Sequence, residues 1–207
     1  MQRFPLISAI ALLAIAPAAM AVPDADGNIS STPAPDISDD AAMQARISYN
    51  IGYETWQKTQ MLENQGATLS GASARENQDA VRSGYVKARE NFRSAVDGDP
   101  DMKEGWNMLG FTSRKLGDYE ESLQAYEKAL KLAPDYPEAI EYRAELFLLT
   151  GRLAQAREAY ASLLKSSPSY AGVLKTAMQD FAKGRRSLPA SVSAAERDEF
   201  ASWVASL

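Results

Sequence analysis

Carboxylates are the side chains of this sequence whose spacing could support chemistry. Glu138, Glu141 and Glu145 follow one another at i, i+3 and i+7, which places them on one face of a helix. Such a stripe could contact basic groups of a ligand, or it could be a solvated or ion-paired surface. Three glutamates on one straight helix cannot surround a metal ion, and paired-carboxylate hydrolysis needs two side chains facing each other across a cleft. The stripe therefore indicates neither a metal site nor a catalytic pair.

The 207-residue chain contains no histidine and no cysteine. Disulfides, thiolate or imidazole metal sites, cysteine nucleophiles and serine–histidine triads are therefore excluded. The chain has 27 acidic and 22 basic residues and a formal net charge of −5, which argues against a nucleic-acid partner, because nucleic-acid binding normally needs a basic patch. We expect a protein that is not an enzyme and that carries no metal and no cofactor.

A repeat of 34 residues supplies the elements that position the polar side chains. The recurring positions are Pro100, Pro134 and Pro168; Phe92, Tyr126 and Tyr160; and Gly117 and Gly151. The most regular unit begins with Trp106, Leu109 and Gly110 on one helix face, and Gly117 is placed to end that helix. Asp118 followed by Glu121 predicts a capping box at the start of a second helix.

This unit resembles the tetratricopeptide repeat, whose pattern is W-x2-L-G-x2-Y, then A-x3-F-x2-A, then P. Ser113 replaces the usual aromatic residue and Ser122 the usual alanine. The resemblance is strong over 103–168 and looser over 45–183. It implies an all-α solenoid of two to three helix–turn–helix repeats, with an N-terminal helix and C-terminal capping helices.

The N-terminal sequence has the features of an export signal. Arg3 precedes an apolar stretch from Leu6 to Ala16, and Ala19-Met20-Ala21 fits a signal-peptidase site. We therefore expect a cleaved signal peptide over 1–21, of bacterial type, and a periplasmic or secreted protein with no stable membrane insertion after cleavage. A permanent membrane anchor is the alternative. Residues 22–38 are rich in Pro, Asp and Ser and predict a disordered leader.

The remaining sequence divides into four segments. Residues 39–102 are interpreted as N-terminal helices with an interrupted first repeat, because Tyr49-Asn50-Ile51-Gly52 resembles the segment after Trp106. The interruption predicts an exposed loop over 64–77. In the alternative interpretation, 39–63 is an unrelated capping helix. Residues 103–136 and 137–170 are the two regular repeats. Residues 171–207 are capping helices, the last opened by a capping box at Ser193 and Glu196; that helix either closes the solenoid or docks a partner.

The resemblance also implies a binding groove, because the first helices of tetratricopeptide repeats line a concave face on which peptides usually bind. Helical period places eleven residues of this sequence on that face: Asn107, Phe111, Arg114, Lys115, Glu138, Glu141, Glu145, Lys175, Tyr49, Tyr53 and Trp56. The last three form an aromatic stripe, which serves either as a set of binding anchors or as core beneath the inserted loop. Substitutions of Phe111, Arg114 or Glu141 are expected to weaken partner binding with little loss of stability.

The sequence therefore favours a non-enzymatic periplasmic scaffold or adaptor that binds a peptide or protein segment, with a role in envelope-protein assembly as one setting. One alternative is a structural subunit of a larger envelope complex. Another is a glycan-binding protein or an enzyme that uses the 39–100 region.

Overall fold

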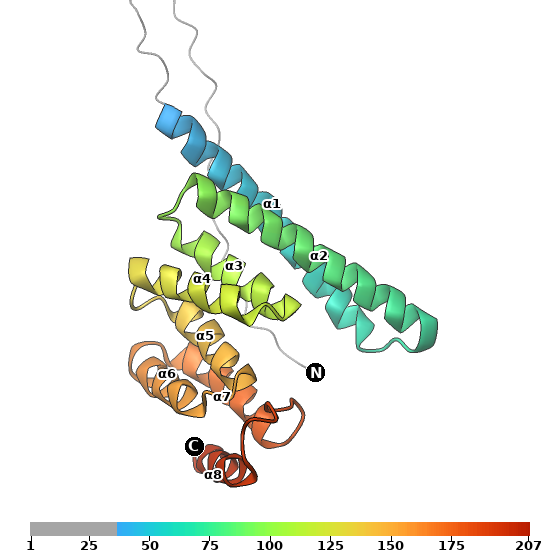
Figure 1. Ribbon diagram of the computed structural model, residues 1–207, viewed down its shortest axis with the longest axis vertical. Helices are drawn as coiled ribbons and strands as arrows, with labels where there is room; N and C mark the ends of the chain where they lie inside the picture. Colours follow the sequence, from blue (N-terminus) through green and yellow to red (C-terminus); the bar gives the residue numbers. More distant parts are fainter. Residues whose placement is uncertain (1–36) are drawn as a thin grey trace, which may run out of the picture. The chain divides into compact units, whose positions relative to one another are not determined.

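The computed structural model describes residues 37–207, which form eight α-helices (Figure 1). Their bounds are α1 Ile37–Gly66, α2 Gly71–Gly98, α3 Lys103–Leu116, α4 Tyr119–Leu132, α5 Pro137–Leu149, α6 Leu153–Ser166, α7 Pro168–Ala182 and α8 Ala194–Ala205. The predicted signal peptide and almost all of the predicted leader lie outside the described residues. No helix within 37–207 combines the length and the apolarity that a membrane span requires.

The helices pack in consecutive pairs, α1 with α2, α3 with α4, α5 with α6 and α7 with α8. Neighbouring pairs meet through α2 and α3, through α4 and α5, and through α6 and α7, and the first helices α3, α5 and α7 also touch one another in turn. This arrangement confirms the predicted all-α fold of tetratricopeptide type.

Small residues let the helices of the central pair approach closely. A Cβ atom at Gly110 of α3 would lie 2.7 Å from the ring of Tyr126 in α4. Ser122 is buried, and its hydroxyl donates a hydrogen bond of 2.8 Å to the Gly110 carbonyl. Serine in place of alanine therefore keeps the close approach and adds a polar contact between the helices.

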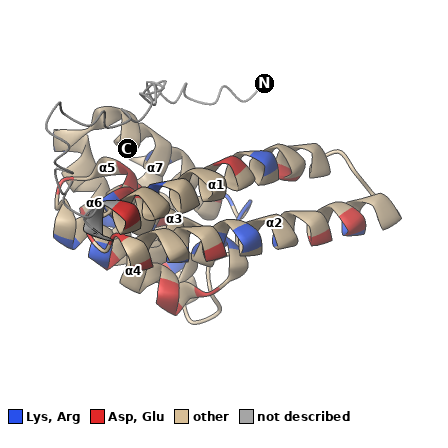
Figure 2. Cartoon of the chain, turned by 90° about the horizontal axis from the view of Figure 1, so that it is seen from above, with Lys and Arg blue, Asp and Glu red and all other residues tan. Residues whose placement is uncertain are grey.

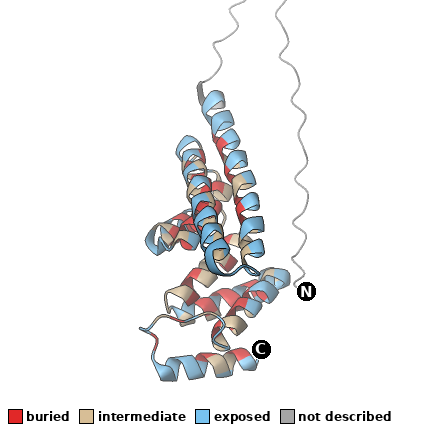
Figure 3. Ribbon diagram, turned by 90° about the vertical axis from the view of Figure 1, so that its right-hand side faces the viewer, coloured by how far each residue is buried: buried red, intermediate tan, exposed pale blue. Residues whose placement is uncertain are grey.

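The first pair repeats this contact over longer helices. A Cβ atom at Gly52 of α1 would lie 3.0 Å from the ring of Phe92 in α2, as in the contact of Gly110 with Tyr126. Beyond this point α1 and α2 continue side by side past α3 and α4 (Figure 1). Both helices expose most of their length (Figure 3).

The prediction of an exposed loop over residues 64–77 is wrong. The chain is helical to Gly66 and again from Gly71, so only residues 67–70 form the turn. Contacts between the two helices continue to this end, because the Asn77 amide donates to the Leu62 carbonyl at 3.0 Å. The Tyr85 hydroxyl likewise donates to Glu63 at 2.7 Å. The extra residues therefore lengthen both helices instead of forming a loop.

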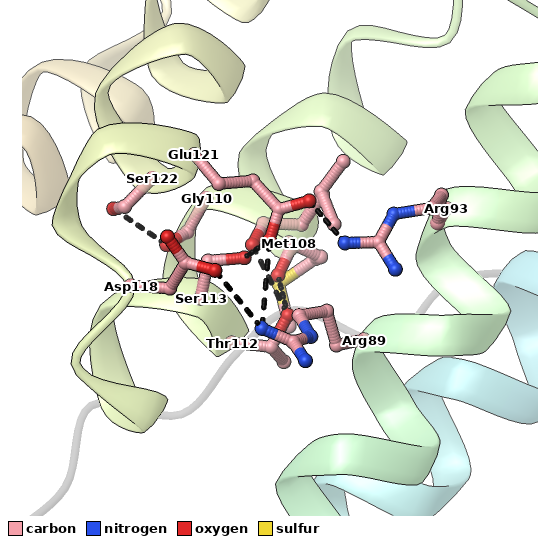
Figure 4. A network of polar contacts seen from close by, with 10 residues as sticks. Arg89, Arg93, Met108, Gly110, Thr112, Ser113, Asp118, Glu121 and Ser122 are labelled. Carbon is pink, nitrogen blue, oxygen red and sulfur yellow. Dashed lines mark hydrogen bonds and ion pairs between the residues drawn. The ribbon is translucent and has the colours of Figure 1, made fainter.

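The start of α4 also differs from the prediction. Asp118 makes no capping hydrogen bond with its side chain; its carboxylate lies 3.4 Å from the Arg89 guanidinium of α2. Glu121 accepts hydrogen bonds from Arg93 and from the Ser113 hydroxyl (Figure 4). The expected capping box is absent because both carboxylates face partners outside α4, and these contacts join α2, α3 and α4.

The C-terminal end follows the sequence more closely. The capping box of Ser193 and Glu196 is present at the start of α8. Phe200 and Val204 of that helix are buried, and the Trp203 ring meets Tyr160 of α6 edge-on, with centroids 6.0 Å apart. The apolar side of α8 therefore covers the last repeat, which agrees with the end-cap interpretation of this helix.

Candidate functional site

We call the surface formed by the first helix of each pair, α1, α3, α5 and α7, the first-helix surface. A buried ion pair lies beneath it. Arg114 of α3 donates to Glu145 of α5, and the two side chains are only 5% and 17% exposed. Arg186, which follows α7, lies 3.2 Å from the same Glu145 carboxylate. The Arg114 guanidinium also lies over the rings of Phe111 and Tyr142, at 5.3 and 5.9 Å from their centroids. Charge and aromatic contacts thus connect α3, α5 and the segment after α7.

A second carboxylate of this network has an unusual environment. Burial, with the neighbouring Glu145 charge, raises the pKa of Glu141 well above its usual range. Its Oε1 has no hydrogen-bond partner among the described residues. Burial also acts to raise the pKa of Glu145, but the ion pairs with Arg114 and Arg186 outweigh it and lower that pKa. Of these two neighbouring carboxylates, Glu145 therefore holds its negative charge more strongly than Glu141.

At the N-terminal ends of α3, α5 and α7, tyrosines and carboxylates lie close together, and Tyr49 from within α1 lies near them. The Tyr170 hydroxyl of α7 donates to Glu138 of α5. Burial, followed by the charges of Glu138 and Glu104, raises the pKa of Tyr136. The pKa of Tyr49 is raised by burial, by Tyr53 and by the same two glutamates. We call this group, Tyr49, Glu104, Tyr136, Glu138 and Tyr170, the tyrosine–acid cluster; all five are only half-buried.

At the opposite ends of the first helices lies a pocket of about 590 Å³. Its wall comes from the parts of α1 and α2 that extend past α3. The pocket is lined by four cationic residues, Arg82, Arg114, Lys115 and Arg186, and by Glu63, with which Lys115 forms an ion pair. Leu69, Val81, Leu116 and Leu149 supply apolar lining. We call this the basic pocket.

Several residues predicted to line the groove are in fact interior. Asn107, Phe111, Arg114, Glu141 and Trp56 are exposed by 3%, 7%, 6%, 1% and 9%. Trp56 of α1 packs edge-on against Phe111, with centroids 5.9 Å apart, because α1 lies against α3 at this level. Burial therefore contradicts the predicted place of Phe111, Arg114 and Glu141 on an open groove, and we now expect their replacement to lower stability, since each lies inside the protein.

The other predicted residues remain accessible. Lys115 is exposed, whereas half-buried positions are occupied by Glu138, Glu145, Lys175, Tyr49 and Tyr53. The aromatic stripe thus combines both interpretations given to it, because Trp56 is core while the rings of Tyr49 and Tyr53 stack at 6.0 Å near the surface. In the glutamate stripe, Glu145 is ion-paired and Glu138 accepts a hydrogen bond, whereas Glu141 is buried without a partner for its Oε1 among the described residues.

The sequence interpretation missed Glu104, Tyr136 and Tyr170 of the tyrosine–acid cluster. The repeat itself contained a usable signal: Glu104 and Glu138 are 34 residues apart, as are Tyr136 and Tyr170. Equivalent positions of successive repeats lie on the same side of a solenoid, so pairs at this spacing form a continuous surface. No repeat spacing pointed to Arg82, because this residue reaches the basic pocket only through the lengthened α1/α2 hairpin.

Residues 113–171 match the tetratricopeptide repeat family. The protein contains tetratricopeptide repeats. The match begins within α3 and ends within α7, so it covers the segment in which helix pairs follow the 34-residue step.

Similar proteins are of diverse kinds. The chain is 39% identical over 72 residues to protein O-mannosyl-transferase TMTC1 of Mus musculus, a match that covers 35% of this chain and 8% of that protein. It is 33% identical over 82 residues to DnaJ homolog subfamily C member 3 of Rattus norvegicus, covering 40% and 16%. It is 33% identical over 86 residues to the uncharacterized protein ycf37 of Guillardia theta, covering 39% and 48%. The matched segment spans less than half the length of each of these relatives.

Proposed function

We propose that this protein is a non-enzymatic adaptor that binds a segment of a partner protein on its first-helix surface. Tetratricopeptide repeats generally mediate protein–protein interaction, and this chain contains them. The observation that carries the proposal is the opposite chemistry of the two ends of that surface, with the tyrosine–acid cluster at one end and the basic pocket at the other.

This polarity defines the chemistry of the partner segment. Half-buried tyrosines beside carboxylates favour basic and aromatic side chains, because a cation is attracted both by an aryl face and by a carboxylate. The basic pocket favours carboxylates with an adjacent aliphatic group, which would pack on Leu69, Val81 and Leu116. A segment with basic residues at one end and acidic residues at the other would bind in one orientation only.

The buried network beneath the surface supports this function physically. Arg114, Glu145 and Arg186 connect α3, α5 and the segment after α7. A surface held in place by such contacts loses little conformational entropy when a ligand binds. We further propose export to the periplasm, on the basis of the N-terminal signal-like sequence; N-terminal sequencing of the mature protein should then begin at Val22.

The test uses photo-crosslinking to obtain the partner and charge reversal to locate its site. A photoreactive residue at Tyr53 should capture a partner in the native host, whereas the same residue at Gln124, exposed on α4, should not. With the captured segment as a peptide, Glu104→Lys should weaken binding about tenfold or more, because it places a cation in the tyrosine–acid cluster.

Glu120→Lys is the matched control, since it makes the same charge change on an exposed position of α4. Both variants should unfold at the same denaturant concentration as the unmodified protein. Equal effects of Glu104→Lys and Glu120→Lys on affinity would show that the partner binds elsewhere. If Glu104→Lys loses both binding and fold, Tyr170→Phe provides the test instead, because it removes only the hydroxyl that donates to Glu138.

A further inference from the structure

An exposed apolar stripe runs along the side of α1 that faces away from α2. The opposite side of the helix packs inward through Ala45, Gly52, Trp56 and Thr59. The stripe consists of Met43, Ile47, Ile51, Met61 and Leu62, whose exposed fractions are 61%, 39%, 49%, 61% and 36%. Large apolar side chains so regularly spaced on one face indicate a surface that another helix covers.

Two charges lie in the middle of this stripe. Glu54 and Lys58 are exposed, four residues apart, and share the face of Ile51 and Met61. Neither has an ion-pair partner among the described residues 37–207. Other parts of α1 and α2 also carry charges of both signs (Figure 2). The stripe therefore combines apolar residues with one acid and one base that are available for a partner.

The central part of the stripe, from Ile51 to Met61, is complementary to itself. In an antiparallel pair of α1 helices centred on residue 56, Ile51 of one copy meets Met61 of the other, and Glu54 meets Lys58. Two-fold symmetry produces each of these contacts twice. In a parallel pair Glu54 would instead face Glu54, and Lys58 would face Lys58, which is unfavourable. The charges thus select the antiparallel orientation and a second copy of this chain as the occupant.

We propose that α1 is the interface of an antiparallel, two-fold dimer of this protein. Residues 47–65, which are symmetric about residue 56, provide a seam of about 27 Å at the helical rise. The seam has the spacing of an antiparallel coiled coil, with apolar positions flanking a central charged pair. A dissociation constant on the order of micromolar is expected, because the central charges limit the apolar area of the seam.

The proposed dimer uses a face of α1 other than the one that carries Tyr49 and Tyr53, and it extends the use of the partner-binding surface. Two copies present two first-helix surfaces, so a partner with two suitable segments would bind with increased avidity. The interface residues and the tyrosine–acid cluster have no residue in common, so each can be altered separately.

Sedimentation velocity of the purified protein over a range of concentrations tests this interface. A reversible monomer–dimer equilibrium is expected. Glu54→Lys should produce a monomer, because each seam would then contain four lysines and no acid at its centre. The double variant Glu54→Lys/Lys58→Glu should recover the dimer within about threefold of the original dissociation constant, because exchanging both charges restores the antiparallel pairs.

Glu90→Lys is the matched control, because it changes an exposed position of α2 outside the stripe and should leave the dimer unchanged. A protein that is monomeric at every concentration would overturn the proposal, as would a double variant that remains monomeric. Circular dichroism should show the same helicity for all variants. If the monomeric Glu54→Lys variant still binds a partner peptide, dimerisation and partner binding are independent, and failure of one proposal does not imply failure of the other.

Discussion

The hairpins α1/α2 and α3/α4 share one packing rule. They differ in the residues that lie between the first helix of each hairpin and the first helix of the next. In both, a glycine of the first helix faces an aromatic ring of the second, Gly52 against Phe92 and Gly110 against Tyr126. Four residues after the glycine, however, α1 carries Trp56 and α3 carries Arg114. The tryptophan packs on Phe111, whereas the arginine pairs with Glu145.

The repeat therefore determines how the two helices of a pair approach each other, but not the chemistry of the layer between successive first helices. The layer between α1 and α3 contains aromatic rings. The layer between α3 and α5 adds a buried ion pair and a carboxylate with an unpartnered oxygen. The following predictions test whether these two layers behave differently.

Removing the buried cation should have the largest effect. Arg114→Leu leaves Glu141 without a nearby cation on α3 and leaves Glu145 with Arg186 alone. The free energy of unfolding should fall by about 3 kcal/mol, as when one partner of a buried pair is removed. Urea denaturation measures this change. Lys115→Leu, which breaks the more exposed pair with Glu63, should cost less than about 1 kcal/mol. Similar losses for both variants would mean that the charged layer adds no special stability.

The pH dependence of stability should report on Glu141. Because burial raises its pKa in the folded state, the folded protein binds more protons than the unfolded chain above the ordinary glutamate pKa. Stability should therefore fall as the pH rises from about 5 to about 8. Glu141→Gln should remove on the order of 2 kcal/mol of this decline, since the amide does not titrate.

The measurement compares unfolding free energies at the two pH values for the original protein and the variant. The chain contains no histidine, so side chains that ordinarily titrate in this interval do not obscure the difference. Glu120→Gln, an exposed change on α4, should keep the original profile. Parallel profiles for all three proteins would show that Glu141 is ionised in the fold.

The shared packing rule should give the smallest effects. Gly110→Ala places a Cβ atom 2.7 Å from a ring that is completely buried, and it should lower the unfolding free energy by about 1–2 kcal/mol despite the better helix propensity of alanine. In Gly52→Ala the new Cβ atom would lie 3.0 Å from Phe92. The unfolding free energy should change by less than about 0.5 kcal/mol, because the gain in helix propensity offsets the tighter contact. Thermal unfolding ranks the two, and the reverse order would break the parallel between the hairpins.

Periodicity identified the residues that form the helix contacts but not the partners of polar residues. Gly110, Ser122 and Tyr126 meet as their spacing indicates, and Ser193 caps α8 with Glu196. Asp118 and Glu121 carry the same short-range pattern as that cap, yet they face Arg89, Arg93 and Ser113. A capping box is local, so sequence indicates it only where no stronger partner from another helix is within reach.

The candidate site divides in the same way. Tyr49, Tyr53 and Glu138, which helical period assigns to the concave face, are half-buried, and the 34-residue step contains the signal for Tyr136 and Tyr170. Period could not show that Asn107, Phe111 and Glu141 would be covered, because a helix face is buried or exposed according to which helices lie against it.

Residue types and their spacing were enough to predict the all-α repeat, the glycine and serine positions at which helices approach, and the exclusion of histidine and cysteine chemistry. These properties depend on residue type and on spacing along one or two neighbouring helices. The packing of the helices was needed to show that residues 64–77 lengthen two helices, that Arg114 is buried with Glu145, and that Arg82 joins Arg186 around one pocket. Those contacts join residues far apart in the chain, and their energies depend on burial and charge, which become defined only when the helix pairs stack.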